Sequence, residues 1–326
     1  MEVYLKMKPK IFIARPIPLI VEEYLQQYCD YNIWNNKEPI PRNVLLESIK
    51  ESQGLMISGD TVDEELLSRA PNLKIVSNIS VGYNNLDLKI MKAKGVIGTN
   101  TPYVLDDTVA DLIMGLILSC GRRIPELDRY VRGKKWDKDI DHNCFGLDIH
   151  HSTLGIIGMG RIGEAVAKRA KFGFDMEVLY HNRKRKYDSE NLIGAKSCTL
   201  EELLIKSDYV VIMTPLTIDT HHLMNYEQFS LMKKTAIFIN ASRGQTVNEE
   251  ALIDALTNKK IYGAGLDVYD KEPIELSNPL LKMSNVVILP HIGTATEKTR
   301  MKMAMRAAQN IITALNGEIP PDIINE

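Results

Sequence analysis

Short apolar runs alternate with amphipathic stretches along nearly the whole chain, and this pattern predicts an α/β protein built on parallel sheets. In the first hundred residues, three apolar runs each precede a stretch whose apolar positions have helical spacing. The predicted strands lie at 11–14, 54–58 and 73–77, and the predicted helices at 19–28, 63–69 and 86–93. The N-terminal part is therefore expected to form a small parallel, doubly wound unit.

A longer helix is predicted after this unit. Pro102 stands near its first turn, where proline is tolerated. Apolar side chains then recur with the spacing of one helical face, at Val109, Leu112, Ile113, Leu116 and Ile117. The uncharged part of this stretch is roughly ten residues long, far short of the ~20 that cross a bilayer. It predicts a buried helix that joins two domains.

The alternation resumes in the second half of the chain and predicts a second doubly wound sheet. A helix after its first strand is expected over 161–172, closed by Gly173. The last helix opens with a capping box of Thr294 and Glu297 and stops at Gly317. The predicted strands lie at 153–157, 176–180, 209–213, 237–240, 263–267 and 286–289. This order of elements is typical of a dinucleotide-binding domain.

The first strand of this half leads into LGIIGMGRIG, which has the glycine spacing of a dinucleotide-binding turn. Gly158 permits the tight turn, Gly160 lets the backbone approach a pyrophosphate, and Gly163 lets the helix pack closely on its strand. The amides of Arg161 and Ile162 are expected to meet the phosphates at the helix N-terminus. Such a motif is a weak signal alone, but here the predicted strand and helix flank it.

Composition and charge narrow the class of partner. A chain of 326 residues is long enough for two domains. Lys and Arg number 40 against 42 Asp and Glu, which gives no electrostatic reason to expect nucleic acid or a membrane as partner. The four cysteines show no CxxC spacing and the N-terminus shows no secretory signal, so we expect a reduced, cytoplasmic protein without a metal site.

Three ionisable residues stand just past predicted strand ends, where open α/β sheets bind their ligands. They are Arg243, Glu272 and His291. Hydride transfer to a 2-oxo acid needs a cation for the carboxylate, an acid for the carbonyl oxygen, and a carboxylate that keeps that acid charged. Each residue alone has an ordinary alternative: a solvated arginine, a turn glutamate or a hydrogen-bonded histidine. Beside a dinucleotide turn, the three together predict a catalytic cleft.

The residues after the second strand of this half predict the choice of cofactor. An NAD-specific site has an acidic residue about 20 positions past the glycine turn, where it binds the ribose 2′-OH. This chain has Asn182 at that place, 19 residues after Gly163, followed by Arg183, Lys184 and Arg185. The cations suit a 2′-phosphate, although a basic run is also typical of a solvated loop. We therefore expect NADP(H) to be preferred, with NAD(H) possible as a second cofactor.

Seven segments, in order along the chain, resemble the landmark segments of the D-isomer-specific 2-hydroxyacid dehydrogenase family. They are NISVGYNNLD, DDTVADLIMGLIL, LGIIGMGRIG, TPLTIDTHHL, FINASRGQTVNEEAL, GAGLDVYDKEP and LPHIGTAT. Within the family the chain is most similar to bacterial glyoxylate/hydroxypyruvate reductases and 2-ketogluconate reductases, for which VLYHNR is typical. The implied activity is NAD(P)H-dependent reduction of small 2-oxo acids to D-2-hydroxy acids.

The resemblance also implies individual roles. Arg243 would bind the substrate carboxylate and carbonyl, His291 would be the general acid in reduction, and Glu272 would orient its ring. The amides of Val81 and Gly82 would hold the other side of the carboxylate. Further cofactor contacts are implied for Thr108, Thr214, Pro215, Ala241, Asp267 and Gly293. For Asp267 there is also an ordinary alternative to cofactor binding, because an aspartate at a strand end often acts as a cap.

The family's fold implies a Rossmann cofactor domain, 102–291, inserted into a flavodoxin-like substrate domain formed by 1–101 and 292–326. Closure of a hinge between the domains would expel water before hydride transfer. A homodimer that pairs through the cofactor domain is also implied, with contributions from the apolar face Val109 to Ile117 and from the segment 122–136. In that segment Trp136 resembles a residue that reaches the neighbouring subunit's site in some relatives, or it is a surface anchor.

Three other functions on the same fold are alternatives to the reduction of small 2-oxo acids. A 3-phosphoglycerate dehydrogenase is disfavoured because the N-terminal unit lacks an extra basic cluster and the chain ends soon after Gly317. Formate dehydrogenases of this type pair the histidine with Gln where this chain has Glu272. A dinucleotide-sensing corepressor on the same fold stays open, because such relatives can keep Arg, Glu and His.

Overall fold

The computed structural model describes residues 7–137, 139 and 142–324. The chain separates into two compact units, Met1–Leu105 with Ala295–Glu326 and Asp106–Thr294. The boundaries predicted from the sequence, at 101/102 and 291/292, come slightly earlier. The predicted domain ranges also include 1–6 and 325–326, which lie outside the described residues.

The first unit is a five-stranded parallel sheet in the order β2-β1-β3-β4-β5. Its strands are β1 (Lys10–Ile13), β2 (Asp30–Ile33), β3 (Gly54–Ile57), β4 (Ile75–Asn78) and β5 (Ile97–Thr99). Its helices are α1 (Leu19–Gln26), α2 (Arg42–Ser48), α3 (Glu64–Arg69), α4 (Leu88–Ala93) and α12 (Glu297–Leu315). This is the flavodoxin-like strand order, which confirms the predicted fold class of this unit.

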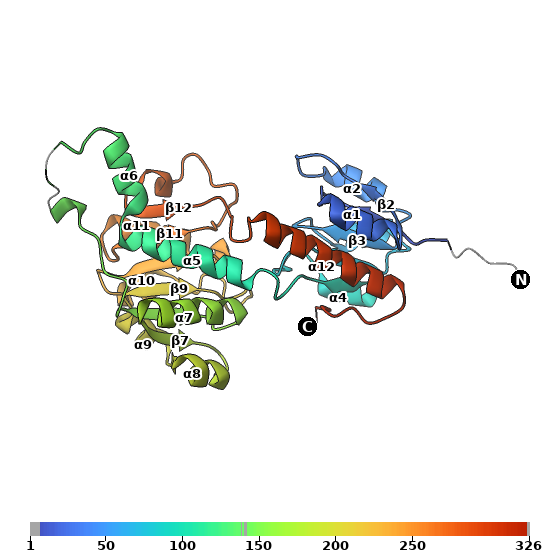
Figure 1. Ribbon diagram of the computed structural model, residues 1–326. Helices are drawn as coiled ribbons and strands as arrows, with labels where there is room; N and C mark the ends of the chain where they lie inside the picture. Colours follow the sequence, from blue (N-terminus) through green and yellow to red (C-terminus); the bar gives the residue numbers. More distant parts are fainter. Residues whose placement is uncertain (1–6, 138, 140–141, 325–326) are drawn as a thin grey trace, which may run out of the picture. The chain divides into compact units, whose positions relative to one another are not determined.

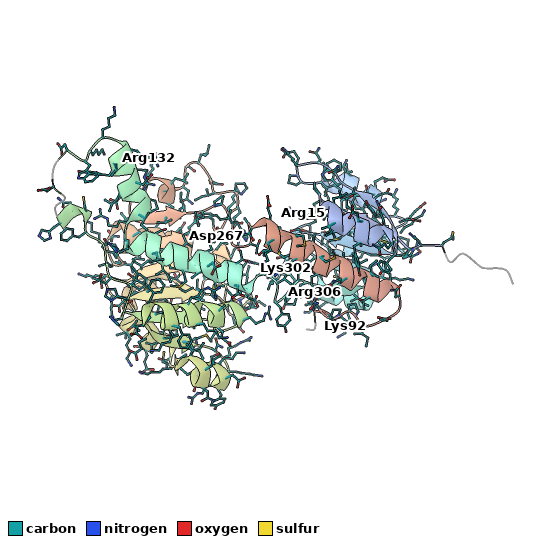
Figure 2. The ribbon with its side chains drawn as sticks, viewed as in Figure 1. Arg15, Lys92, Arg132, Asp267, Lys302 and Arg306 are labelled. Carbon is teal, nitrogen blue, oxygen red and sulfur yellow. The ribbon has the colours of Figure 1, made fainter. Side chains whose placement is uncertain are left out.

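The C-terminal helix belongs to this first unit because polar contacts fasten it there. Helix α12 packs on β3 and β4. The guanidinium of Arg306, labelled in Figure 2, forms two hydrogen bonds to the buried carboxylate of Asp322, at 2.5 and 2.9 Å. Ile323 then makes an antiparallel bridge to Thr99, so the chain end lies along β5. Segments from both ends of the sequence therefore share one core.

The second unit is a seven-stranded parallel sheet in the order β12-β11-β10-β9-β6-β7-β8. Its strands are β6 (Thr153–Ile157), β7 (Glu177–His181), β8 (Lys196–Ser197), β9 (Tyr209–Ile212), β10 (Ile237–Asn240), β11 (Gly263–Leu266) and β12 (Val286–Ile288). The order reverses between β6 and β9, as in the Rossmann fold, and dinucleotides bind where this reversal opens a crevice. The predicted doubly wound fold of the second half is confirmed.

Helices cover this second sheet. Figure 1 shows α5 (Asp106–Gly121) beside α7 (Arg161–Phe174), and the two helices pack on each other. Leu203 of α9 (Leu200–Lys206), Phe229 of α10 (Tyr226–Leu231) and Leu252 of α11 (Glu249–Thr257) share a core with β9 and β10. The remaining helices are α6 (Ile124–Arg132) and α8 (Tyr187–Ile193), with 3-10 turns at His142–Cys144, Gly244–Thr246 and Pro279–Lys282. Among the described residues, no helix is long and apolar enough to cross a membrane.

Several predicted helix ends are wrong by a few residues. Helix α5 begins at Asp106, beyond Pro102. Helix α7 continues through Gly173 to Phe174, and Asp175 caps it in the left-handed region. The cap of α12 is Thr296, whose hydroxyl accepts from the amide of Thr299, whereas Thr294 ends the second unit. Two threonines so close together have the same capping chemistry, so spacing alone could not choose between them.

Candidate functional site

The glycine turn after β6 has the geometry that its spacing predicts. Gly158 has φ of +103°, and a Cβ there would lie 2.8 Å from backbone atoms of Met213. A Cβ on Gly163 would lie 2.6 Å from the carbonyl oxygen of Gly158, so only glycine lets α7 come this close to its strand. A Cβ on Gly160 would meet nothing within 4 Å, which leaves space in front of the turn.

The start of α7 fits a dinucleotide pyrophosphate. Gly160 caps this helix without a side-chain hydrogen bond, and the first amide bonded within the helix is that of Glu164, to the carbonyl oxygen of Gly160. Arg161 and Ile162 occupy the intervening turn, where amides and helix dipole favour an anion. The hydroxyl of Thr214, which follows β9, is buried with no hydrogen-bond partner among the described residues. An unsatisfied buried hydroxyl beside the turn is a further fit to a polar ligand.

The structure gives Asn182 a role that the spacing did not predict. Its side-chain oxygen accepts from the amide of Met159 at 2.7 Å, and its side-chain nitrogen donates to the carbonyl of Met159 at 3.2 Å. The side chain therefore holds the middle of the glycine turn from β7. An aspartate could make only the first of these bonds, because it has no N–H to donate.

The cations of the basic run after Asn182 are all exposed but differ in how firmly they are paired. The guanidinium of Arg183 lies 4.0 Å from the carboxylate of Asp219. Arg185 instead forms two hydrogen bonds to Glu190, at 3.0 and 2.7 Å. Arg183 and Lys184 are thus the cations of this run that remain available to a ligand.

His291 and Glu272 form a close ionisable pair at the carboxyl edge of the sheet. The imidazole Nδ1 lies 2.6 Å from Oε2 of Glu272, and Oε1 accepts from the amide of Tyr269 at 3.0 Å. Burial opposes the charge on Glu272, but the bonds from His291 and Tyr269 and the nearby Arg243 charge outweigh it. The pKa of Glu272 is therefore lowered. With Nδ1 facing the carboxylate, Nε2 of His291 remains for a substrate.

Arg243 is held by a loop with little freedom. Its backbone carbonyl accepts from the side chains of Asn240 and Thr246, at 3.0 and 2.7 Å, and its own guanidinium donates to the carbonyl of Ser242. Burial lowers the pKa of Arg243, and the Glu272 charge opposes that shift. The half-buried guanidinium stays cationic over the working pH range, since arginine is not deprotonated in proteins.

Gly244 fixes the distance between the Arg243 loop and the Glu272 loop. A Cβ at this position would lie 1.7 Å from the carbonyl oxygen of Tyr269. Gln245 adds a bond from its side chain to the carbonyl of Asp270. The two loops that carry the predicted cation and carboxylate therefore touch through their backbones.

Asp267, labelled in Figure 2, holds the loop after His291. Its two carboxylate oxygens accept from the amides of Ile292 and Gly293, both at 2.8 Å. Burial raises the pKa of Asp267 although these amides oppose the shift. Asp267 therefore caps the loop after His291, which is the ordinary alternative to cofactor binding. The amide of Gly293 has its hydrogen-bond acceptor in Asp267. Nicotinamide contacts of both residues stay predictions.

The other predicted cofactor residues lie in the second unit. Thr108 is in the first turn of α5, Ala241 follows β10, and Pro215 is in the loop after β9, where its carbonyl accepts from Thr220. Val81 and Gly82 belong to the first unit, where their carbonyls accept from the side chains of Asn100 and Asn78. Contact of their amides with a substrate stays a prediction.

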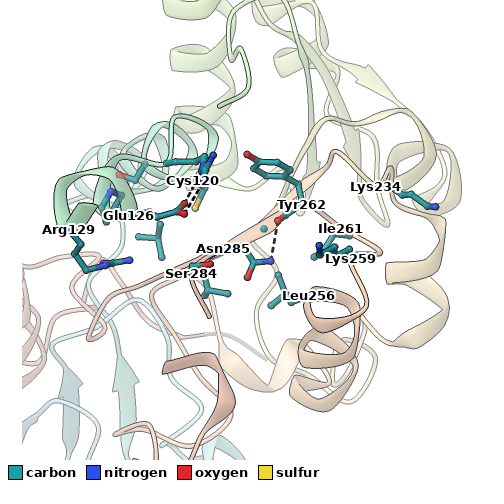
Figure 3. Close-up of a pocket in the computed structure, with 16 residues that line it drawn as sticks. Cys120, Glu126, Arg129, Lys234, Leu256, Lys259, Ile261, Tyr262, Ser284 and Asn285 are labelled. Atoms are coloured by element: carbon teal, nitrogen blue, oxygen red, sulfur yellow. Dashed lines mark hydrogen bonds and ion pairs between the residues drawn. The ribbon is translucent and has the colours of Figure 1, made fainter. Parts of the chain in front are cut away.

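Two cavities lie at opposite edges of the second sheet. One, of about 540 Å³, adjoins the His291–Glu272 pair and is lined by Tyr269, Glu272, Pro273, Ile274, Ile288, Leu289, Pro290 and His291. Another, of about 510 Å³, is shown in Figure 3 and lies where β11 and β12 begin, next to Tyr262 and Asn285. Strand beginnings lie at the edge opposite the His291–Glu272 pair, so this second cavity is a separate feature. Among the described residues, no His, Cys, Asp or Glu cluster could hold a metal ion.

Tyr269 and Asn240 were missed by sequence reasoning. Both act on the site through backbone groups: Tyr269 donates its amide to Glu272, and Asn240 holds the carbonyl of Arg243. A buried tyrosine or asparagine beside a strand has many ordinary explanations, so nothing in the sequence separates these two from others. Only their places within DVYDKEP and NASRG gave a signal.

Comparison with known proteins gives the same family as the motifs. The family model described as "D-isomer specific 2-hydroxyacid dehydrogenase, NAD binding domain" matches residues 114–293. A glyoxylate/hydroxypyruvate reductase B from Enterobacter sp. (strain 638) is 44% identical, with 98% of each chain covered.

Solved structures are similar over the same length. The TT0316 protein from Thermus thermophilus has a TM-score of 0.91 and 38% identity, covering 97% of this chain and 100% of that one. An NADPH-dependent glyoxylate/hydroxypyruvate reductase from Sinorhizobium meliloti, solved with NADP and malonate, has a TM-score of 0.83 and 29% identity, covering 97% of both chains. The motifs, the two sheets and these matches agree: the chain belongs to the D-isomer-specific 2-hydroxyacid dehydrogenase family.

Proposed function

We propose that this protein is an NADPH-dependent reductase of small 2-oxo acids, with glyoxylate and hydroxypyruvate as leading substrates and 2-ketogluconate as a longer one. The observation that carries the proposal is the 2.6 Å contact of His291 with Glu272 at the edge where Arg243 is half-buried. Cation, acid and carboxylate are the three groups that the reaction needs. The reductases similar to this chain support the substrate class.

The residues divide the work as follows. Arg243 binds the substrate carboxylate through its planar guanidinium, and the amides of Val81 and Gly82 are proposed to bind the same carboxylate. A bound reduced nicotinamide would supply the hydride. His291 then gives a proton from Nε2 to the carbonyl oxygen as negative charge develops there. Glu272, fixed by the amide of Tyr269, keeps the ring oriented and balances its positive charge.

The cofactor would lie along the carboxyl edge of the second sheet. Arg161, Ile162 and Gly163 meet the pyrophosphate, while Arg183 and Lys184 meet a 2′-phosphate. Further contacts come from Thr108, Thr214, Pro215, Ala241, Asp267 and Gly293. The second unit thus serves as the dinucleotide-binding domain and the first as the substrate-binding domain. The chain passes between them twice, at Leu105 to Asp106 and Thr294 to Ala295, which suits a hinge.

Assembly and location complete the proposal. We expect a homodimer, supported by the exposed apolar side chains of Ile124, Val131 and Trp136 in and after α6. We place the protein in the cytoplasm, because Cys29, Cys120, Cys144 and Cys198 are all free. The interacting partners are then a small 2-oxo or 2-hydroxy acid and a second copy of the chain.

The test is NADPH oxidation by the purified protein across 2-oxo acids of increasing length, including 3-phosphohydroxypyruvate. Turnover that is fastest with glyoxylate or hydroxypyruvate supports the proposal. Turnover confined to the phosphorylated acid would indicate a 3-phosphoglycerate dehydrogenase instead. Tight NADPH or NADH binding with no turnover of any 2-oxo acid would overturn the proposal in favour of a dinucleotide-sensing protein.

A further inference from the structure

Tyr269 lies where the three loops that carry the proposed catalytic groups meet. Its side chain is 6% exposed and packs in the core shared with α10 and α11. Its amide donates to Oε1 of Glu272, and its carbonyl oxygen lies against the backbone of Gly244, next to Arg243. The backbone of one residue thus touches two of the three loops.

The hydroxyl of Tyr269 reaches the third loop. It donates to the carbonyl of Leu289, two residues before His291, at 2.8 Å, and lies 3.3 Å from the carbonyl of Leu266. The last ladder contact between β11 and β12 is the bond from the amide of Leu289 to the carbonyl of Leu266. The tyrosine hydroxyl therefore continues the ladder one step beyond the strands, just before the chain turns toward His291.

The left-handed backbone of His291, with φ of +52°, shows why such a fastening matters. A non-glycine residue persists in this region only when its surroundings hold it there. Asp267 fastens the chain after His291 through Ile292 and Gly293, and Tyr269 fastens it before His291 through Leu289. Together they fix the backbone on both sides of His291, and with it the position from which the imidazole extends.

We propose that Tyr269 is a positioning residue that sets the distance between the His291 ring, the Glu272 carboxylate and the Arg243 guanidinium. It touches no substrate or cofactor in this account. Removing its hydroxyl would free the Leu289 carbonyl and let the His291 loop drift relative to Glu272. Misplacement of a reacting group by about 1 Å can cost on the order of 10²-fold in rate. The inference rests on the proposed reductase function.

The experiment compares Tyr269→Phe with Tyr209→Phe. Tyr209 is a matched control because it is 1% exposed and its hydroxyl donates to the carbonyl of Asp148 at 3.1 Å, at the opposite edge of the sheet. For Tyr269→Phe we expect kcat to fall about tenfold, while KM for the 2-oxo acid and the Kd of NADPH change less than about twofold. The reason is that this substitution removes only the hydroxyl bond to the His291 loop, whereas the glycine turn and the backbone contact of residue 269 with Gly244, next to Arg243, are unchanged. For Tyr209→Phe we expect wild-type kcat, KM and Kd.

Thermal unfolding of both variants separates positioning from folding. An unchanged kcat in Tyr269→Phe overturns the inference. An equal loss of kcat in both variants, or losses in Tyr269→Phe that follow only its lower Tm, also overturns it. Turnover by the wild-type protein is measured in the same series. If the wild type is inactive with every 2-oxo acid, the proposed function fails, whereas an active wild type with an unaffected Tyr269→Phe variant contradicts only the positioning role.

Discussion

We expect single residues after β7 to decide the choice between NADPH and NADH. Arg183 is exposed and only loosely paired with Asp219, whereas Arg185 is held by Glu190. We expect kcat/KM with NADPH to exceed that with NADH at least about tenfold, or ~1.4 kcal/mol in transition-state binding. Arg183→Ala should remove most of this preference by lowering the NADPH value, and Arg185→Ala should leave it nearly unchanged. Steady-state kinetics with both cofactors measures this.

An equal effect of the two substitutions would contradict the assignment of Arg183 to the 2′-phosphate. Asn182→Asp is a poorer test of cofactor choice than Arg183→Ala. It adds a charge where the adenine ribose is expected, but it also breaks the bond from Asn182 to the carbonyl of Met159. A loss of both NADPH and NADH affinity in that variant would report the damaged glycine turn.

The lowered pKa of Glu272 fixes the pH range in which its charge stabilises the protein. A carboxyl whose folded pKa lies below its unfolded value contributes stability above that unfolded value, 4.5. The contribution is lost as the pH falls through the folded pKa. Wild type should therefore be more stable than Glu272→Gln at pH 5 to 7, and the difference should shrink below about pH 4. Urea unfolding across this range measures it; a difference that grows with acidity would contradict the lowered pKa.

At the scale of elements, the close approach of two loops at Gly244 makes a clear prediction. A Cβ there would lie 1.7 Å from a backbone oxygen, so Gly244→Ala should lower the free energy of unfolding by at least about 2 kcal/mol. Gly173→Ala is the control, because Gly173 is exposed inside α7 and a Cβ there meets nothing within 4 Å. It should gain roughly 0.5–1 kcal/mol. Chemical denaturation compares them; equal stability of the two variants would refute the interlocked loops.

Elements with strong periodicity could be predicted, and those without it could not. The apolar runs that become β6, β9 and β10 are buried at nearly every position, so composition alone marks them. Strand β2, in contrast, has no buried residue and lies at the sheet edge, and β8 is two exposed residues long. Edge strands are specified by the backbone of their neighbour, which leaves little trace in their own sequence.

The candidate site could be predicted where chemistry selects the residue type. Arg243, Glu272 and His291 followed from their strand-end positions and from what hydride transfer requires. The contacts that hold the glycine turn and the His291 loop could not be predicted. Asn182, Asp267 and Tyr269 make these contacts with backbone groups that any residue could offer. Their partners are far apart in sequence and meet only in the folded sheet.

At the scale of the whole molecule, the apolar surface of α6 and the segment after it predicts self-association. Helix α6 has no buried residue, and Ile124, Val131, Trp136 and Phe145 are each at least half exposed. Covering such a surface is favourable, so we expect a dimer at micromolar concentration. Val131→Glu should shift it toward monomer, while Ile319→Glu, at an 84% exposed site in the first unit, should not. Sedimentation velocity measures this, and a monomeric wild type would contradict the expectation.

The central claim is that His291, oriented by Glu272, protonates the substrate oxygen while the rest of the molecule binds the ligands. The most direct measurement is kcat of His291→Asn for glyoxylate reduction, taken together with the Kd of NADPH. We expect kcat to fall roughly 10²-fold or more with the Kd of NADPH nearly unchanged, since general acid catalysis is lost and the cofactor groups remain. A variant that keeps near-normal kcat would show that His291 is not the general acid.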